Sequence, residues 1–255
     1  MDAGNQTLLF DPRMQLLAGL LLTGGLSEFL PSSDDETVVR YMEVERLTGD
    51  EPTAVRNLLE NLASGGILER RFVKRLISCP NCSSTHSQKP VDSPQSYHLC
   101  ETCGRSFAIE RTVLTDVYAY KLSKDAESQL TGERSPLKPL EESLVGCGYD
   151  VTIGGIVQGA SGTKHWFNVV AVRESDAGKD TIVVDLVAAD SLVGVNPVLI
   201  LFAKRYDVDA NKSVLIAMPG IMETGRKLAS MYGITLIEAS NIAEAAHKLR
   251  QSLSP

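Results

Sequence analysis

Two hydrophobic periodicities divide the C-terminal half of the chain into strands and helices. Apolar runs of four to eight residues predict strands, and apolar positions three or four residues apart predict helices. The predicted order is a helix over 137–145, strands over 150–157, 162–175 and 181–188, a helix near 197–206, a strand over 213–218, a helix over 222–232, a strand over 235–238 and a helix over 241–253. This order predicts a mixed sheet flanked by helices.

The predicted strand over 162–175 reads GTKHWFNVVAVRES. Both alternating sets of its side chains are largely apolar, so we expect it to be buried on both faces. It contains the only tryptophan of the chain, Trp166, and an amide, Asn168, where burial alone would favour a hydrocarbon. A buried amide needs a hydrogen-bond partner, so Asn168 is a position to explain.

The N-terminal third predicts two helices followed by a basic strand. Apolar residues recur at helical spacing over 37–47, a turn follows at 48–50, and a second helix over 52–64 ends at two glycines. Residues 67–77 then read as a basic hairpin or strand that carries Arg70, Arg71, Lys74 and Arg75.

This order resembles a winged helix-turn-helix, and the GGILERRF ending is similar to the entry into a wing. The resemblance implies that residues 52–64 form a recognition helix with Thr53, Arg56, Asn57, Glu60 and Asn61 outward. For this helix, contact with DNA through Arg56 and Asn57 and docking of a protein partner are both open. For the four basic residues at 70–75, phosphate contact and a solvated strand face are both open.

Four of the five cysteines form two C-x2-C pairs, Cys79 with Cys82 and Cys100 with Cys103, and 17 residues separate the pairs. This spacing predicts a structural zinc site, and Gly104 suits the turn after the second pair. Four thiolates leave no open position for a substrate. A pair of disulfides is the alternative, which a reducing compartment disfavours.

Two histidines near the predicted zinc site and the fifth cysteine are of residue types that can bind metals. His86 and His98 are either spare metal ligands or ordinary loop residues, and we expect loop residues because four thiolates suffice. Cys147, the fifth cysteine, is expected to be a buried small apolar residue.

Composition allows two or three ordinary domains in 255 residues. The net charge of −7 is uneven: residues 1–66 hold 4 Lys/Arg and 11 Asp/Glu, residues 67–125 hold 9 and 6, and the remainder holds 12 and 15. Only the middle segment therefore has the positive charge that a duplex-binding module usually carries. No apolar run approaches the roughly 20 residues of a membrane span, so we expect a cytoplasmic protein without a membrane partner.

The chain from about residue 137 to 250 resembles the Mrr-type branch of the PD-(D/E)XK nuclease superfamily. The similar pieces are CGYDV, SGTKHWFNVVAV, TIVVDLVAAD, FAKRYDVD and KLASMYGITLIEA. Residues 124–136, KDAESQLTGERSP, contain little to bury and two turn signals, so we expect a linker there. The resulting fold class is α+β multidomain: a winged helix over 1–77, a zinc ribbon over 78–123, and a restriction endonuclease-like mixed sheet over 137–255.

In active members of that superfamily, an aspartate and a D/E-x-K triplet hold magnesium and polarise the attacking water. The resemblance carries the aspartate onto Asn168 and the triplet onto Asp185, Leu186 and Val187, so only Asp185 matches. Loss of a carboxylate ligand and of the lysine implies a degenerate site.

Nuclease activity at this site would need replacement residues from neighbouring elements. If activity remains, the candidates are Asp185, a helix glutamate at Glu141 or Glu142, and a relocated lysine at Lys204 or Lys164, with Mg2+ as cofactor. Lys204 is otherwise a surface residue near a helix end.

These features lead to three hypotheses about function. The first is a non-catalytic regulator or adaptor, related to transcription, that binds DNA or a DNA-bound protein complex, carries structural zinc and can be a homodimer. The second is a magnesium-dependent DNA endonuclease, and the third is a protein–protein scaffold that uses the acidic N-terminal domain. The three-part chain resembles uncharacterised archaeal proteins.

Overall fold

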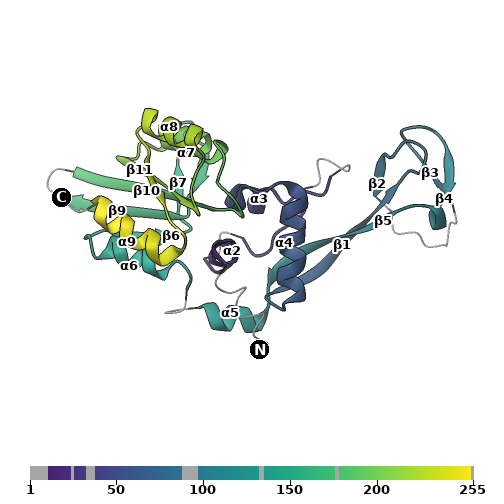
Figure 1. Cartoon of the computed structure of the whole chain (residues 1–255), viewed down its shortest axis with the longest axis horizontal. Coiled ribbons are helices and arrows are strands. Elements are labelled where there is room, and N and C mark those ends of the chain that lie inside the picture. The colour runs from purple at the N-terminus through teal and green to yellow at the C-terminus, as the bar shows by residue number, and fades with distance from the viewer. Residues whose placement is uncertain are drawn as a thin grey trace.

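The computed structural model describes residues 11–23, 26–32, 38–87, 97–131, 135–175 and 178–253. An N-terminal unit of helices and a C-terminal unit built on a sheet lie side by side, and a long hairpin projects from the first (Figure 1). The α+β class expected from the sequence is confirmed. In the described part of the chain, no helix has both the length and the apolar character needed to cross a bilayer.

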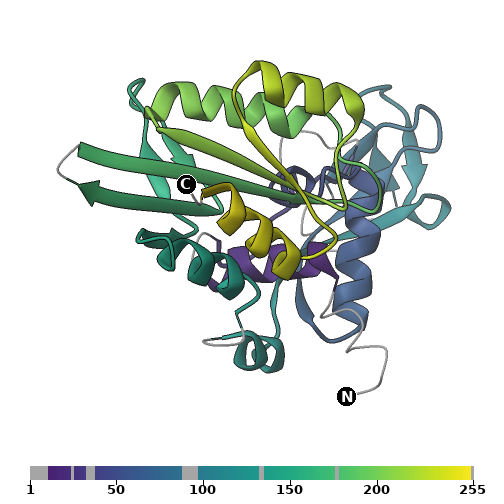
Figure 2. The ribbon, with the colours of Figure 1, turned by 60° about the vertical axis from the view of Figure 1, so that its left-hand side comes forward.

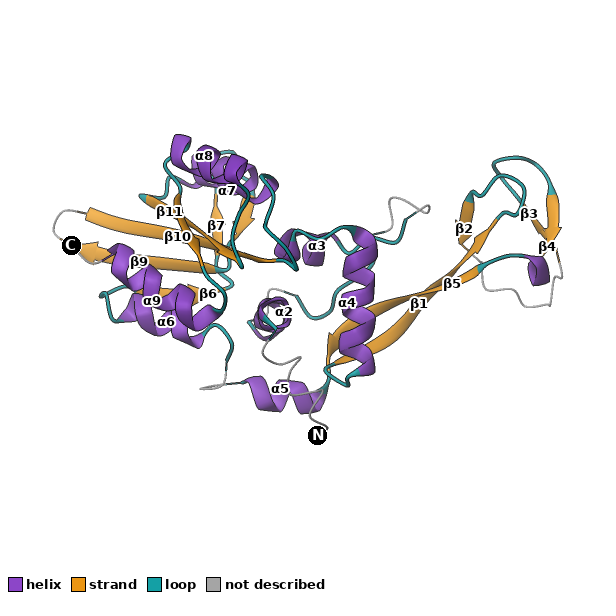
Figure 3. Ribbon diagram, viewed as in Figure 1, coloured by secondary structure: helices purple, strands orange, loops and turns teal. Residues whose placement is uncertain are grey.

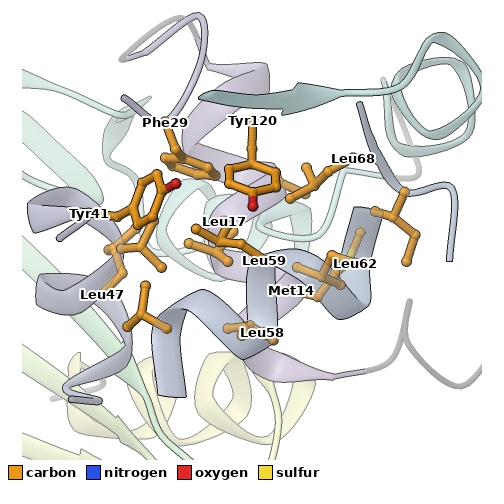
Figure 4. Packing of buried hydrophobic residues seen from close by; sticks show 14 of the residues in the cluster. Met14, Leu17, Phe29, Tyr41, Leu47, Leu58, Leu59, Leu62, Leu68 and Tyr120 are labelled. Carbon is orange, nitrogen blue, oxygen red and sulfur yellow. The ribbon is translucent and has the colours of Figure 1, made fainter. Parts of the chain in front are cut away.

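The N-terminal unit packs three helices against one end of a hairpin. The helices are α2 (Pro12–Leu22), α3 (Met42–Thr48) and α4 (Pro52–Ser64), and the hairpin strands are β1 (Leu68–Ser78) and β5 (Leu114–Leu122). Their apolar side chains form one core, in which the rings of Tyr41 and Tyr120 meet edge to face at 5.6 Å (Figure 4). Thr37, where the first predicted helix was expected to begin, lies outside the described residues.

The sequence pattern did not predict α2 as a helix. Its apolar residues are distributed around the helix, because α2 is buried from two sides. Met14 and Leu17 belong to the N-terminal core, whereas Leu16 belongs to a core of the C-terminal unit. A helix that is apolar all round lacks the one-sided stripe that marks a surface helix.

The hairpin carries a small module at its far end (Figures 1 and 3). The module contains β2 (Thr85–Ser87), which pairs with β1, and a separate ribbon of β3 (Tyr97–Leu99) and β4 (Ser106–Ala108), followed by the short helix η1 (Ile109–Arg111). The segment 78–123, expected to be one module, also contains β5, which returns along β1 as far as the pair of Leu68 with Leu122. Long-range strand pairing decides this division, and no local signal marks it.

Part of the expected linker forms a helix, α5 (Lys124–Leu130). Ser123 precedes it and accepts a hydrogen bond from the Ala126 amide at 3.2 Å, and Ala126 and Leu130 are buried against the N-terminal core. A helix of two turns that buries two apolar residues has too little periodic signal to be predicted. Residues 132–134 of the same segment lie outside the described residues.

The C-terminal unit is a five-stranded mixed sheet between two layers of helices (Figure 2). The strand order is β12 (Thr235–Glu238), β11 (Lys212–Met218), β10 (Gly178–Ala188), β9 (Val169–Ser175) and β6 (Asp150–Ile153). β10 to β12 are parallel, and β6, β9 and β10 are antiparallel. The helices α6 (Lys138–Val145) and α9 (Ile242–Leu253) cover one face, and α7 (Asn196–Val208) and α8 (Glu223–Met231) cover the other.

Two of the predicted strands are broken where the chain changes direction. Residues 150–157 divide into β6 and β7 (Ile156–Gln158) at Gly154, whose φ is +67°. Residues 162–175 divide into β8 (Lys164–Trp166) and β9 at Phe167 and Asn168. The prediction of one continuous buried strand was therefore wrong: β8 pairs with β7 in a small hairpin, and only β9 joins the main sheet.

The two units share a packed interface. Leu137 of the C-terminal unit lies against α2 so closely that a Cβ at Gly19 would be 2.8 Å from its Cδ1. At the other end of the interface, α3 lies against β10, and the Arg13 guanidinium forms an ion pair with Asp190 at 2.6 Å. The end of α3 therefore faces the strand that carries Asp185.

Candidate functional site

The three polar residues singled out in the C-terminal half converge on one small cavity. Asn168, Asp185 and Lys204 all line it, although they come from the residue before β9, the C-terminal half of β10 and the third turn of α7. The cavity has a volume of about 20 Å3, which is close to the space that one water molecule needs. Sequence spacing alone did not determine this convergence.

Asp185 and Lys204 form a buried ion pair. The Lys204 Nζ lies 2.5 Å from Asp185 Oδ2, and the two side chains are 9% and 13% exposed. The ammonium also lies 4.1 Å from the centroid of the Phe167 ring, where cation–π attraction is favourable. Burial lowers the pKa of Lys204 below its ordinary value, and the Asp185 carboxylate opposes this shift. Lys204 is therefore buried and is not a surface residue near a helix end, which was the alternative expectation from the sequence.

Asn168 completes the hydrogen bonding of β10. The ladder between β9 and β10 ends at the pair Val169 and Val184, so the Leu186 amide has no strand partner on that side. The Asn168 Oδ1 accepts a hydrogen bond from the Leu186 N–H at 2.8 Å, and the side chain is almost fully buried. A side-chain carbonyl here takes the place of the next ladder bond, which explains an amide at a buried position.

The end of α3, in the N-terminal unit, forms one part of the cavity wall, and Val187 of β10 forms another. Arg46 and Leu47 of α3 form part of the wall, and the Arg46 guanidinium lies 5.3 Å from the centroid of the Trp166 ring. Gly49, with φ of +66°, follows α3, and a Cβ there would be 3.6 Å from Val187 Cγ1. Val187, which stands where the resemblance placed a lysine, therefore packs against the N-terminal unit.

Glu141 is not part of this cluster. It lies on α6, on the opposite face of the sheet from α7, and it pairs with Lys138 at 3.4 Å. The cavity lining includes neither Glu141 nor Glu142 nor Lys164. Outside the cavity, a groove of about 520 Å3 runs between α3 and the start of α7, and Arg46, Pro197 and Ile200 line both spaces.

The four cysteines Cys79, Cys82, Cys100 and Cys103 form a second candidate site. Their sulfur atoms all lie within 4.8 Å of one another, with 3.8 Å between Cys79 and Cys103 and 3.6 Å between Cys82 and Cys100. Tetrahedral zinc with bonds of about 2.3 Å separates its sulfur ligands by about 3.8 Å. The cluster can therefore hold a metal ion such as zinc. Gly104 has the positive φ, +68°, expected after the second pair.

The environments of these thiols differ. A hydrogen bond from Ser84 lowers the pKa of Cys100 to about 5, burial opposes the shift, and His86 and the Cys103 amide support it. Burial raises the pKa of Cys79 to about 11. His86 is buried and lies against Cys100, so it is not the ordinary loop residue that the sequence suggested. Ser84 directly precedes the short strand β2, and His86 lies two residues later, so both side chains point to the same side, toward the sulfurs.

Three of the four basic residues at 70–75 are already paired within the molecule. Arg70 pairs with Glu60 at 3.1 Å, Arg71 with Glu28 at 2.6 Å and Arg75 with Asp116 at 2.5 Å. Lys74 forms no ion pair with any described residue. These pairs reduce the free positive charge on β1 that the sequence suggested.

The outward face of α4 is mostly exposed. Thr53, Arg56, Asn57 and Asn61 are exposed, as expected for the face of a recognition helix. Glu60 is an exception to the expected outward set, because it is half-buried and accepts a hydrogen bond from the Tyr120 hydroxyl at 2.6 Å. The hydrogen bond to Tyr120 of β5 holds this carboxylate against the hairpin.

Sequence reasoning missed a third polar cluster, centred on Asp207. The Asp207 carboxylate accepts hydrogen bonds from the Ser161 hydroxyl and amide at 2.6 and 2.8 Å, and its Oδ2 lies 2.6 Å from His165 Nε2. The Ser161 hydrogen bond, followed by His165, lowers the pKa of Asp207 to about 2. Serine and histidine both bind the carboxylate, so the cluster lacks the serine–histidine contact of a catalytic triad. It joins the β7–β8 hairpin to the end of α7.

Comparison with known proteins gives limited information. No family model matches this chain, and no curated protein matches it. Among solved structures, the chain is similar to AF1548, a protein of unknown function, with 22% identity, a TM-score of 0.32, and coverage of 38% of this chain and 52% of that one. It is also similar to VC1899 from Vibrio cholerae, with 11% identity, a TM-score of 0.40, and coverage of 99% and 57%.

A third similar structure is EndoMS in apo form, with 12% identity, a TM-score of 0.25, and coverage of 74% of this chain and 95% of that one. The chain spans little more than half the length of the first two structures. At these identities and TM-scores, the three likenesses carry no argument about activity, and the two candidate sites must be interpreted from their own geometry.

Proposed function

We propose that this protein is a non-catalytic, DNA-associated regulator or adaptor. In this proposal, the N-terminal unit is a winged helix with α4 as its recognition helix, the four-cysteine module is a zinc ribbon, and the C-terminal unit is a nuclease-like domain without nuclease activity. Its partner is DNA or a DNA-bound protein complex. The cysteine cluster holds zinc in a structural role, because four thiolates leave no coordination position for a substrate.

The observation that carries the proposal is the small volume of the cavity beside Asp185. A catalytic magnesium ion keeps several waters and also contacts a substrate phosphate, which needs far more than the room of one water. Here the cavity has only about 20 Å3, and α3 of the N-terminal unit supplies part of its wall. The Asp185 charge is already neutralised by Lys204 at 2.5 Å.

The two residues that depart from the nuclease pattern, Asn168 and Val187, each have a structural role here. Asn168 provides a neutral acceptor for the Leu186 amide, and Val187 provides an apolar surface against Gly49. An aspartate at 168 would add a second buried carboxylate beside Asp185, and a lysine at 187 would bury a charge in the interface between the units. Both residues suit a docking surface better than a metal site.

The nuclease hypothesis keeps one favourable observation, which is that Lys204 reaches Asp185. The discriminating experiment incubates the purified protein with supercoiled plasmid and Mg2+ or Mn2+, beside an Asp185→Ala variant. The proposal expects no cleavage by either protein. Cleavage by the wild type that is lost in Asp185→Ala would overturn it in favour of an endonuclease.

DNA association is tested by salt titration of duplex binding. Arg56→Ala and Lys74→Ala each remove a cation that has no ion-pair partner among the described residues, so each should reduce the salt slope by about one. Lys179→Ala, on the exposed start of β10 in the other unit, is the matched control and should leave the slope unchanged. Absence of duplex binding, or a slope indifferent to Arg56 and Lys74, would favour the scaffold hypothesis instead.

A further inference from the structure

Ser84 and His86 form hydrogen bonds with the cysteine cluster without belonging to it. The Ser84 hydroxyl oxygen lies 3.0 Å from Cys82 Sγ and 3.2 Å from Cys100 Sγ. His86 Nε2 lies 3.2 Å from Cys100 Sγ and 3.0 Å from the same hydroxyl. His86 is 8% exposed, so solvent has little access to its contact with the sulfur.

Counting the protons on Ser84 and His86 limits which side chain can donate to each sulfur. A metal-bound thiolate only accepts hydrogen bonds, and a serine hydroxyl has a single proton. Ser84 can therefore donate to only one of its two sulfur neighbours at a time. When it donates to Cys82, the side-chain donor left for Cys100 is His86, and this requires the proton of the imidazole to be on Nε2. The Cys103 amide adds a weaker contact to Cys100 at 3.4 Å.

We infer that His86 is a positioning residue for the metal site: its Nε2–H holds the Cys100 thiolate and slows the loss of the metal. The inference rests on the proposed zinc binding. Outer hydrogen bonds to metal ligands fix ligand orientation, and their removal commonly reduces metal affinity by roughly 10–100-fold. The module depends on such contacts because its own apolar core is small and consists, among the described residues, of Ile77, Cys79, Cys100 and Phe107.

His98 provides a matched control within the same module. Its ring lies 5.4 Å from the rings of both His86 and Phe107, so it shares the same local packing. Its Nε2 is buried and has no hydrogen-bond partner among the described residues. Replacing His98 therefore disturbs the packing without removing a hydrogen bond to sulfur.

The test measures zinc release from the full chain to a chromogenic chelator, after the zinc content of each variant has been determined. His86→Ala should release zinc at least about tenfold faster than the wild type. His86→Gln should recover part of the difference, because its amide can donate, and His98→Ala should remain within about twofold. Nitrogen-15 spectra of the zinc-loaded wild type should show the His86 proton on Nε2.

Two results would overturn the inference while zinc binding itself stands: release from His86→Ala at the wild-type rate, or equal acceleration in His98→Ala. A proton on Nδ1 of His86 would also overturn it. A wild-type chain that holds no zinc would instead remove the proposed zinc site, and the inference with it.

Discussion

The buried pair of Asp185 and Lys204 gives the sharpest prediction about stability. Removing one partner of a buried pair leaves an uncompensated charge and costs about 3–5 kcal/mol, whereas replacing both partners with apolar residues is often neutral. Since about a tenth of each side chain is exposed, we expect the lower end of this range, about 3 kcal/mol, for Lys204→Met. Asp185 Oδ1 already lacks a hydrogen-bond partner among the described residues, so the remaining carboxylate would be poorly compensated.

The assay is equilibrium urea unfolding, followed by the fluorescence of Trp166, which lines the same cavity. With an m-value on the order of 3 kcal/mol/M, Lys204→Met should lower the midpoint by about 1 M. The double variant Asp185→Leu with Lys204→Met should recover most of this loss.

The reasoning would be refuted by additive behaviour. If the double variant loses as much stability as the two single variants together, the two charges do not compensate each other in the folded protein. Asp185→Leu alone should be milder than Lys204→Met, because the remaining ammonium keeps its contact with the Phe167 ring and can also deprotonate.

Three further predictions concern other parts of the molecule. Asn168→Ala should cost about 1–3 kcal/mol in urea unfolding, because the buried Leu186 amide loses its acceptor; an unchanged midpoint would contradict this role. The depressed pKa of Asp207 means that its contribution to stability is present above the unfolded value near 4 and is lost as the pH falls through about 2, so the difference in midpoint between wild type and Asp207→Asn should shrink over that window. Removing metal with a chelator should make residues 79–111 sensitive to protease while Trp166 fluorescence stays unchanged, since the module lies at the end of the hairpin; a shift in that fluorescence would show that the units depend on the metal.

Local sequence signals were sufficient where one residue type or one periodic face determines the outcome. The two C-x2-C pairs predicted the cysteine cluster, because a metal knuckle depends on spacing within five residues. The amphipathic stripe of residues 52–64 predicted α4, whose apolar side faces a single core. The central strands of the C-terminal sheet were predicted from their continuous apolar runs, which suit strands buried on both faces.

The sequence pattern did not predict segments whose structure depends on packing or pairing with distant parts of the chain. Because α2 is buried between two cores, its sequence shows no polar face, and its apolar run was not assigned to a helix. The hairpin strand β5 was assigned to the cysteine module, because only its long-range pairing with β1, from Leu68 with Leu122 to Ile77 with Leu114, shows where it belongs. The linker prediction missed α5 because its stability comes from docking and not from its own composition.

The sequence by itself determined which residues are chemically unusual: four cysteines, a buried amide and an aspartate without its expected partners. Only the tertiary structure decided what they do. Asn168, Asp185 and Lys204 belong to three elements, so their meeting depends on how α7 crosses the sheet, and closure of their cavity depends on a helix from the other end of the chain. Burial, and not residue identity, turns Lys204 into an ion-pair partner and Val187 into a contact for Gly49, because the free energy of a charge or a methyl group depends on what surrounds it.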